Sequence, residues 1–146
     1  MAAPRYNPTS NQMVRVDTDN PAVQQIRTRV TAAQVNAGLT LLAAVPGYAY
    51  RLIDVALIAI GGAASGATDV RILGTRAAGS VALLVAAVAG LTQSTLLRAG
   101  AANATLLADG TSHTPLDANT AITIGKTGGS LATATHVDVI LTYALE

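Results

Sequence analysis

The sequence contains no cysteine, no phenylalanine and no tryptophan. The lack of cysteine excludes disulfide bonds, thiolate metal sites and a cysteine nucleophile. Large aromatic residues normally supply much of the buried area of a core, so valine, leucine, isoleucine and alanine must supply it here. We therefore expect a single subunit to bury little area per residue and to gain stability by assembling with copies of itself.

Charged residues are also scarce, at 12% of the chain. Nine lysines and arginines nearly balance eight aspartates and glutamates, which leaves a formal net charge of +1. Without a basic surplus, nucleic acid is not expected as a partner. Apolar residues make up 51% of the chain and the mean hydropathy is +0.44, a balance that argues against a disordered protein. The length of 146 residues is that of one domain.

Two uncharged stretches, residues 30–50 and 77–97, are long enough to consider as membrane-spanning helices. Both contain several small polar residues and glycines, and only Val81–Leu91 is densely apolar. No basic cluster or aromatic belt flanks either stretch, and the start of the chain lacks a signal-peptide pattern. We expect no contact with a membrane, and a small integral membrane protein remains the alternative.

Hydrophobic alternation with a period of two predicts a series of β-strands. The clearest are Val23–Val30, Tyr48–Ile60 and His136–Leu145. Weaker patterns predict further strands over Thr68–Thr75, Val81–Val88, Leu91–Arg98, Thr105–Ala108 and Thr120–Lys126. Glycine-rich segments at 61–67 and 127–130 predict a loop and a turn, and Asp109-Gly110 predicts a hairpin. After the first strand, residues 31–38 open with a capping residue and end in glycine, which suits one or two helical turns or an irregular crossing.

About eight short strands at roughly ten-residue spacing are typical of an all-β fold, an antiparallel β-sandwich of the jelly-roll type. The polar segment 1–20 contains Pro4 and Pro8 and predicts an extended N-terminal arm. Residues 21–146 would then form a single β-sandwich domain.

Few residues suggest chemistry. His113 with Asp117 and His136 with Asp138 could hold a divalent metal if the two pairs met in space, but nothing in their spacing requires it. Ser112, His113 and Asp117 lack the glycine-flanked elbow of a serine hydrolase. The glycine strings do not follow a phosphate-loop pattern. We therefore expect no catalytic residues, no metal and no cofactor, and we do not expect an enzyme.

Charges on the apolar strands raise a separate question. Arg51, Asp54 and Asp138 each interrupt a largely hydrophobic stretch. A buried lone charge is too costly to keep, so each must face solvent or meet a partner at a contact between subunits.

Several segments resemble the small virion structural proteins of tailed bacteriophages, of the capsid decoration (cement) kind. The resemblance covers roughly residues 48–146. It is carried by Tyr50–Val55 with Ile58–Ala64, by Leu91–Ser94 with Arg98–Ala101, and by Asp117–Ile124, Lys126–Gly128, Leu131–Thr135 and Val137–Ala144.

The resemblance implies a jelly-roll-like sandwich that forms homotrimers on the outer surface of an icosahedral phage head. The trimers would lie at three-fold or pseudo-three-fold positions and bridge neighbouring copies of the major capsid protein. The resemblance implies no active site and no cofactor. Another virion component, such as a head fibre base or a tail protein, is the alternative within the same class, and a sugar-binding sandwich is a more distant one.

This hypothesis places the contacts between subunits on the strands 48–60 and 136–145. The predicted trimer-interface residues are Tyr48, Tyr50, Leu52, Asp54, Val137, Val139 and Tyr143. The arm and the loops around Gly62 and Gly128 would touch the capsid, with Arg5, Tyr6 and Arg15 as the predicted contact residues.

Overall fold

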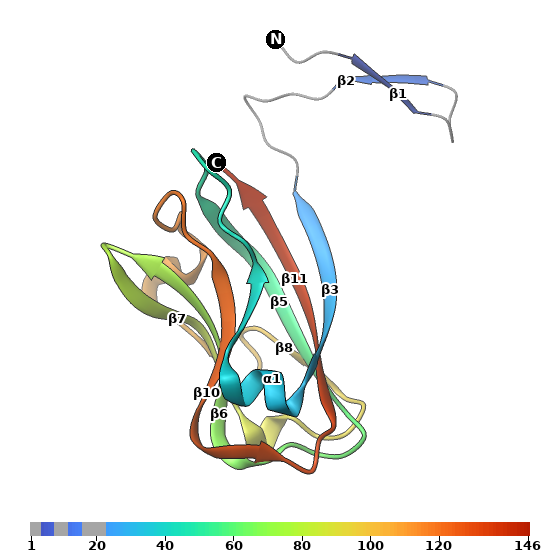
Figure 1. The fold of residues 1–146 in the computed structure, drawn as a ribbon, viewed down its shortest axis with the longest axis vertical. Coiled ribbons are helices and arrows are strands. Elements are labelled where there is room, and N and C mark those ends of the chain that lie inside the picture. Colours follow the sequence, from blue (N-terminus) through green and yellow to red (C-terminus); the bar gives the residue numbers. More distant parts are fainter. Residues whose placement is uncertain (1–3, 8–11, 16–22) are drawn as a thin grey trace.

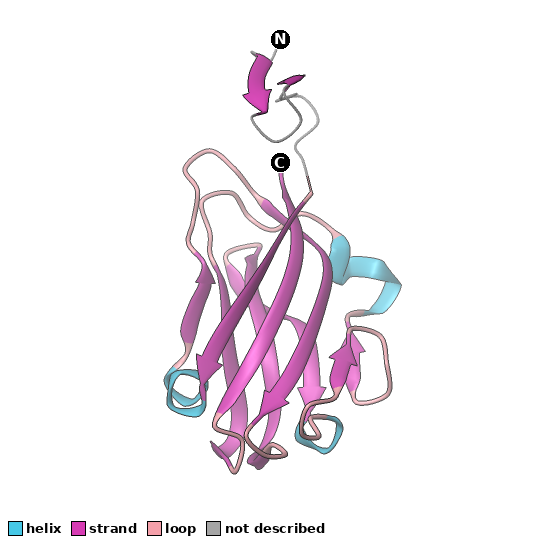
Figure 2. Cartoon of the chain, turned by 90° about the vertical axis from the view of Figure 1, so that its right-hand side faces the viewer, coloured by secondary structure: helices cyan, strands magenta, loops and turns pink. Residues whose placement is uncertain are grey.

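The computed structural model describes residues 4–7, 12–15 and 23–146, and its architecture is all-β (Figures 1 and 2). Two antiparallel sheets, one of four strands and one of five, carry most of these residues. A separate antiparallel pair is formed by β1 (Pro4–Asn7) and β2 (Gln12–Arg15). In these described ranges no helix combines the length and the apolar character needed to cross a membrane.

The four-stranded sheet has the order β3-β11-β5-β8. Its strands are β3 (Gln24–Thr31), β11 (His136–Leu145), β5 (Tyr50–Ile60) and β8 (Leu96–Arg98). The sequence pattern gave the bounds of β11 correctly and those of β3 and β5 to within two residues. Strand β11 occupies an inner position, so the end of the chain pairs on both sides.

The five-stranded sheet has the order β4-β10-β6-β7-β9. Its strands are β4 (Leu39–Leu42), β10 (Ile122–Ala132), β6 (Ser65–Arg76), β7 (Gly79–Ala87) and β9 (Ala104–Leu106). Two 3-10 helices, η1 (Val88–Gly90) and η2 (Ala108–His113), lie in the connections.

The strand pairs are nested along the chain. Strand β3 pairs with the last strand, β11, and β4 pairs with the strand before it, β10. Strand β5 pairs with β8, while β6 and β7 form the hairpin between them. The first half of the chain therefore pairs with the second half as in one long hairpin, and successive strand pairs are distributed between the two sheets.

The connection from β3 to β4 contains the short helix α1 (Ala32–Ala37). The Thr31 side chain accepts a hydrogen bond from the Gln34 backbone N–H, and the Gln34 side chain accepts one from the Thr31 N–H. This reciprocal capping box confirms the predicted helical turns.

The buried side chains of both sheets form one hydrophobic cluster. It is built from aliphatic residues, and its aromatic members are Tyr50 and Tyr143, which meet edge to face at a centroid distance of 5.4 Å. The Tyr50 hydroxyl donates to the Ala43 carbonyl and the Tyr143 hydroxyl to Gln24 Oε1. Burial, together with the neighbouring Tyr143, raises the pKa of Tyr50.

Strand β5 does not alternate as the sequence pattern predicts. Tyr143 pairs with Leu52 whereas Thr142 pairs with Asp54, so Ile53 is an extra residue in the ladder. Such a bulge reverses the alternation that follows it. As a result Tyr50 and Leu52 face the core before the bulge, and Val55, Leu57 and Ala59 face it afterwards.

Four local predictions are wrong or only partly right. The predicted loop 61–67 ends early because β6 begins at Ser65, and the predicted turn 127–130 lies within β10, where the register shifts at Gly128. Asp109-Gly110 does not make a hairpin, because both residues lie at a kink in η2. Of the predicted strand 91–98 only β8 is extended.

The predicted arm, residues 1–20, is described only where β1 and β2 pair. Residues 1–3, 8–11 and 16–22 lie outside the described part of the chain, so the extended arm remains a prediction.

Candidate interaction surface

The outer face of the four-stranded sheet is defined by the strand register. Arg29, Asp138, Ile58 and Leu96 stand opposite one another in one row, and Arg27, Ile140, Ala56 and Arg98 in the next. Residues directly opposite in a ladder project to the same side of the sheet. The intervening row contains the core residues Val139, Leu57 and Leu97, so these two rows project away from the core.

A three-residue ion cluster dominates one side of this face. Asp138 Oδ2 accepts hydrogen bonds from Arg27 Nη2 at 2.5 Å and from Arg29 Nη2 at 3.1 Å, and Asp138 Oδ1 accepts one from Arg29 Nε at 2.8 Å. The Asp138 side chain is only 1% exposed although it lies on an outer face, because the two arginines cover it. The hydrogen bonds from Arg29, followed by those from Arg27, lower the pKa of Asp138 to about 2.

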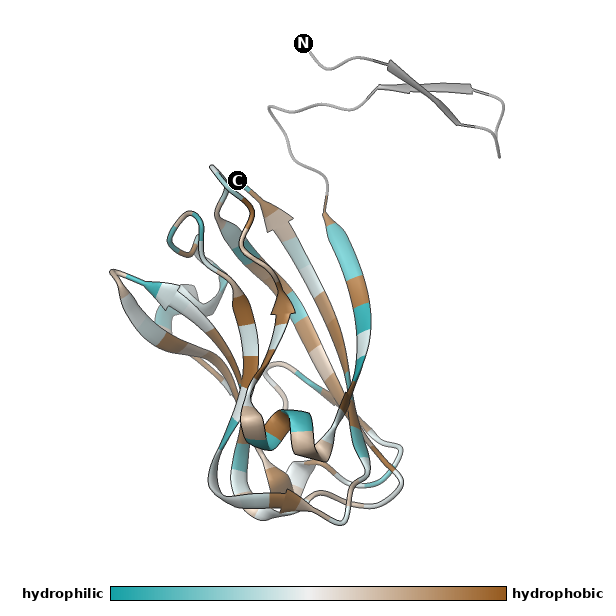
Figure 3. Cartoon of the chain, viewed as in Figure 1, coloured by the Kyte–Doolittle hydropathy of each residue, from teal (hydrophilic) through white to brown (hydrophobic). Residues whose placement is uncertain are grey.

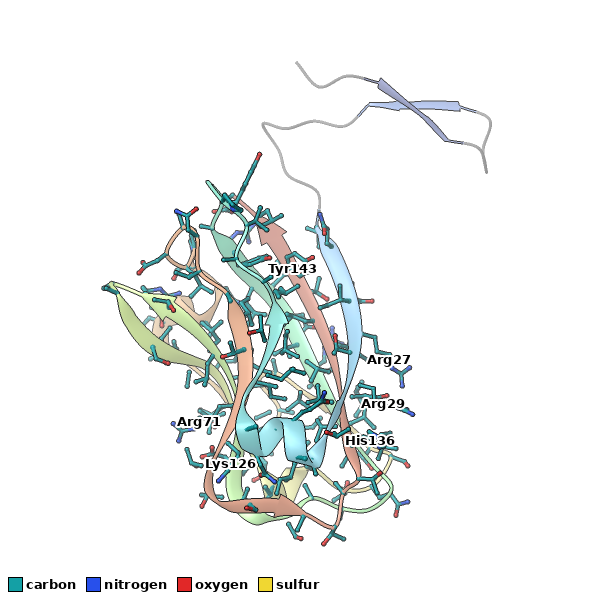
Figure 4. The ribbon with its side chains drawn as sticks, in the orientation of Figure 1. Arg27, Arg29, Arg71, Lys126, His136 and Tyr143 are labelled. Atoms are coloured by element: carbon teal, nitrogen blue, oxygen red, sulfur yellow. The ribbon has the colours of Figure 1, made fainter. Side chains whose placement is uncertain are left out.

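The arginines of this cluster remain open to solvent. Their side chains are 60% and 56% exposed for Arg27 and Arg29, and Figure 4 shows both projecting away from the sheets. A guanidinium has five N–H donors. In the described part of the chain, Nη1 of each arginine has no hydrogen-bond partner. Two cations share one carboxylate, so the cluster carries a net positive charge and spare donors.

The centre of the face is apolar. Ile58 and Ile140 are half-buried, as are Ile53 and Ile60 farther along β5, while Leu96 is 53% exposed. A second ion pair borders this apolar strip. In this pair Arg98 Nη2 lies 2.8 Å from Asp54 Oδ2. An apolar centre with a charged border is typical of a protein–protein contact.

Among the residues that the structure describes, no strand pairs with the outer side of β3, which forms an edge of the same sheet. The Thr31 N–H is donated to Gln34 rather than to β11, whereas the Ala32 N–H is donated to the Thr135 carbonyl. In an antiparallel ladder the backbone groups of successive residues point to opposite sides. The N–H and C=O groups of Gln25, Arg27 and Arg29 therefore point away from β11, toward the free edge. Hydrophilic and hydrophobic bands alternate along β3 in Figure 3.

The outer face of the five-stranded sheet has a comparable but smaller feature. Asp69 is 6% exposed, and its Oδ1 accepts a hydrogen bond from Arg71 Nε at 2.8 Å. This bond is the main reason why the pKa of Asp69 is lowered. With one arginine for one carboxylate, this pair is neutral.

The predicted trimer-interface residues do not share one surface. The core contains Tyr50, Leu52, Val137, Val139 and Tyr143. Their side chains support the two sheets of a single chain and are not accessible to a partner. Asp54 lies on the outer face beside Arg98, and Tyr48, at 47% exposed, precedes β5. The predicted strands, β5 and β11, do form part of the candidate face. Most of the residues predicted within them, however, have side chains on the opposite side of the sheet, in the core.

The predicted capsid-contact residues lie in the separate strand pair. Arg5 and Tyr6 belong to β1 and Arg15 to β2. Their contact with a capsid stays a prediction.

The residues weighed for chemistry are not brought together. His113 Nδ1 lies 3.1 Å from the Leu52 carbonyl, whereas His136 pairs with Ile60 eight residues along β5, roughly 26 Å away at strand spacing. Ser112 Oγ donates to the Leu83 carbonyl and accepts from the Leu107 N–H. Across the described residues, no group of three or more His, Cys, Asp or Glu side chains is placed to hold a metal ion.

Asp117 likewise has a structural role. Its carboxylate accepts hydrogen bonds from the Ala77 N–H at 3.0 Å and the Ala78 N–H at 2.8 Å. Ala77 and Ala78, which both have positive φ, form the turn between β6 and β7. Asp117 therefore braces this turn.

Comparison with known proteins adds no assignment. A scan against models of protein families, a search of curated proteins and a search of solved structures each found no match to this chain.

Proposed function

We propose that the chain is a non-enzymatic virion structural protein that decorates and stabilises the outside of an icosahedral phage head. In this proposal it forms homotrimers at three-fold or pseudo-three-fold positions that bridge copies of the major capsid protein. The observation that carries the assembly part is the outer face of the four-stranded sheet, where an apolar strip lies between the Arg27–Asp138–Arg29 cluster and the Asp54–Arg98 pair. The phage assignment rests on the sequence resemblance.

We further propose that the fold is a β-sandwich of the jelly-roll type. In a jelly roll, eight strands B to I form the sheets B-I-D-G and C-H-E-F. If β3 to β8, β10 and β11 are taken as B to I in chain order, the observed sheets have these two orders, with β9 added beside β7. The nested pairing supports this assignment, as does the shared core of the two sheets.

The apolar strip supports self-assembly for an energetic reason. Ile58, Ile140 and Leu96 are partly exposed in one patch. A partner that covered this patch would gain a binding free energy of roughly 25 cal/mol for each Å² of apolar surface removed from water. A permanent contact between subunits commonly buries more than about 2,000 Å² of accessible surface in total. In a trimer bound to a capsid, weak contacts add because three subunits bind together.

The oligomer part of the proposal is tested by analytical ultracentrifugation of the purified full-length chain. We expect a trimer for the unmodified protein and a shift toward monomer for Leu96→Asp, which adds a charge to the exposed end of the apolar strip, on edge strand β8. Thr105→Asp is the matched control, because Thr105 stands in the outward row of the other sheet, opposite Val85. A monomer for the unmodified chain at micromolar concentrations, or a trimer that both substitutions leave unchanged, would refute this use of the face.

The capsid part is tested by imaging. Gold-labelled antibody against the protein should mark phage particles over the whole head. Label confined to one vertex or to the tail would instead identify a head fibre base or tail component. If no part of the particle is labelled, the proposal that the protein belongs to the virion is wrong.

A further inference from the structure

One lateral edge of the sandwich carries an excess of positive charge. This edge is formed by β3, and it contains the cluster of Arg27, Arg29 and Asp138. Two guanidiniums share one carboxylate there, and both are more than half exposed. One further carboxylate would balance the charge and accept N–H donors that Asp138 does not use.

The described part of the chain contains one acidic residue that is free to supply this carboxylate. Among residues 23–146, Asp109 is the one acidic residue whose carboxylate has no hydrogen bond or ion pair. The others are held within the chain, Asp54 by Arg98, Asp69 by Arg71, Asp117 by two backbone N–H groups, Asp138 by its two arginines and Glu146 by Arg51. Asp109 is exposed and lies at the kink of η2.

Helix η2 holds Asp109 in a defined place. The Ser112 side chain is fully buried, and its hydroxyl donates to the Leu83 carbonyl of β7. The Thr111 hydroxyl donates to the Ala108 carbonyl and closes the turn that contains Asp109. The carboxylate is therefore presented on a turn that is anchored in the core, so that little backbone ordering is needed when a cation binds it.

Helix η2 and β3 lie on opposite lateral edges. In the order β3-β11-β5-β8, the side of β5 away from β11 is taken by β8 and, farther along, by η2, where His113 Nδ1 lies 3.1 Å from the Leu52 carbonyl. Three strand spacings, roughly 14 Å, separate the two edges. In Figure 1, β3 lies at one side of the molecule and β7, to which η2 is bonded, at the other. Asp109 therefore cannot reach the arginines of its own chain.

We propose that Asp109 of a second copy of this chain binds Arg27 and Arg29. Two carboxylates, Asp138 from one chain and Asp109 from the next, then balance two guanidiniums. A second copy fits better than an unrelated acidic protein, because each chain carries both halves of the contact and an unrelated protein would leave Asp109 unpaired. Contact between two β3 edges would instead place arginines against arginines, which is unfavourable.

The position of the two halves determines the kind of assembly. Because they lie on opposite edges, each copy binds one neighbour through its arginines and another through Asp109, which is a heterologous contact. Such a contact closes a ring of three when each copy is rotated by one third of a turn relative to the last. This inference rests on the proposed assembly of the chain with itself and names the ion contact that orders the copies.

A charge swap tests the contact in the full-length chain. Arg27→Glu and Asp109→Arg each bring like charges together, and we expect each to weaken self-association roughly tenfold. The double variant restores opposite charges and should return the dissociation constant to within about threefold of the original. The matched control joins Asp109→Arg with Lys126→Glu, which has the same net charge. Lys126 lies on β10 and donates to the Gly128 carbonyl, so no recovery is expected. Sedimentation velocity at a series of concentrations measures each constant.

A second set of variants places no new charge beside Asp138. Arg27→Gln and Asp109→Asn each remove one charge from the contact. If the two side chains meet, the loss of association in the double variant should be clearly smaller than the sum of the two single losses. Additive losses would overturn the contact. Circular dichroism during thermal unfolding establishes that each variant is folded before its assembly is compared.

The outcomes separate this inference from the proposed function. Recovery in the charge swap, and not in the control, supports the contact. If the single variants weaken the assembly without recovery in the swap, or if they leave it unchanged, Asp109 is not the partner of the arginines while self-assembly stands. If the unmodified chain is a monomer, both proposals fail.

Cross-linking tests the ring, because the chain has no native cysteine. A chain with both Arg27→Cys and Asp109→Cys, oxidised well above the dissociation constant of Arg27→Gln, should give linked dimers and trimers and nothing larger. The Cα atoms of a disulfide lie within about 7 Å, so the two positions of one chain cannot be linked to each other. A ladder that continues beyond three chains would overturn the closed ring, and finding only unlinked chains would overturn the contact.

Discussion

Replacing Asp138 by asparagine should destabilise the protein, because the carboxylate is the shared partner of Arg27 and Arg29. Asparagine keeps the shape and removes the charge. The two guanidiniums then remain close together with no anion between them. The pKa of Asp138 falls from 3.8 to about 2 in the folded chain, and at about 1.4 kcal/mol for each unit this gives about 2–3 kcal/mol. Because both arginines are more than half exposed, solvent screening reduces the expected loss to about 1–2 kcal/mol.

Urea unfolding at fixed protein concentration measures this loss, and its pH dependence identifies the cause. The folded-state pKa lies below the unfolded one, so the ionised carboxylate stabilises the fold above about pH 4, and the stabilisation is lost as the pH falls from 4 to 2. The difference between the unmodified protein and the variant should shrink over this window. Glu146→Gln, at an exposed position, is the control. A variant as stable as the unmodified protein at pH 7, or a difference that is the same at pH 7 and pH 2, would refute the reasoning.

Two further substitutions test local features of the fold by the same unfolding measurement. Thr31→Ala removes one half of the capping box with Gln34 and should cost about 1 kcal/mol; no measurable loss would mean that the cap contributes nothing. Gly66→Ala should cost clearly more than Gly47→Ala, although both glycines have φ near +80°, because an added Cβ at 66 meets the Ser130 carbonyl oxygen whereas that at 47 meets open space. Equal costs for the two variants would contradict the close approach at Gly66.

The sequence pattern predicted the all-β class and most strands because it depends on local alternation. In the last strand, Val137 and Val139 alternate with Asp138 and Ile140, and the structure places the valines in the core. A period of two is a property of neighbouring residues, and no knowledge of the partner strand is needed to detect it.

The bulge at Ile53 could not be predicted in this way. It arises where β5 pairs with β11, between Thr142 and Tyr143. Sequence alternation placed Asp54 on the side of Tyr50 and Leu52, and the bulge separates them. The prediction of a turn at Gly128 and Gly129 was wrong for a related reason, because it also depends on a neighbouring strand. The two glycines predict a turn, yet they extend β10 where the chain passes close to Thr68 and the Gly66 backbone.

The ion cluster on the candidate face was visible only in part. Arg27 and Arg29 share one side of a predicted strand, and Asp138 is the lone acid of another, which raised the question of its partner. Their meeting depends on the register between strands whose charged residues lie 109 and 111 positions apart in sequence. Local patterns do not contain that register, so the cluster required the structure.

The inner position of β11 has a consequence for biosynthesis. Strand β11 must insert between β3 and β5, so neither of those strands acquires its shared neighbour until residues 136–145 have been synthesised. Folding of this sheet therefore waits for a strand that lies far from β3 in the sequence, and such long-range closure is slow. A nascent chain stalled before β11 has emerged would present β3 and one side of β5 unpaired to chaperones and proteases.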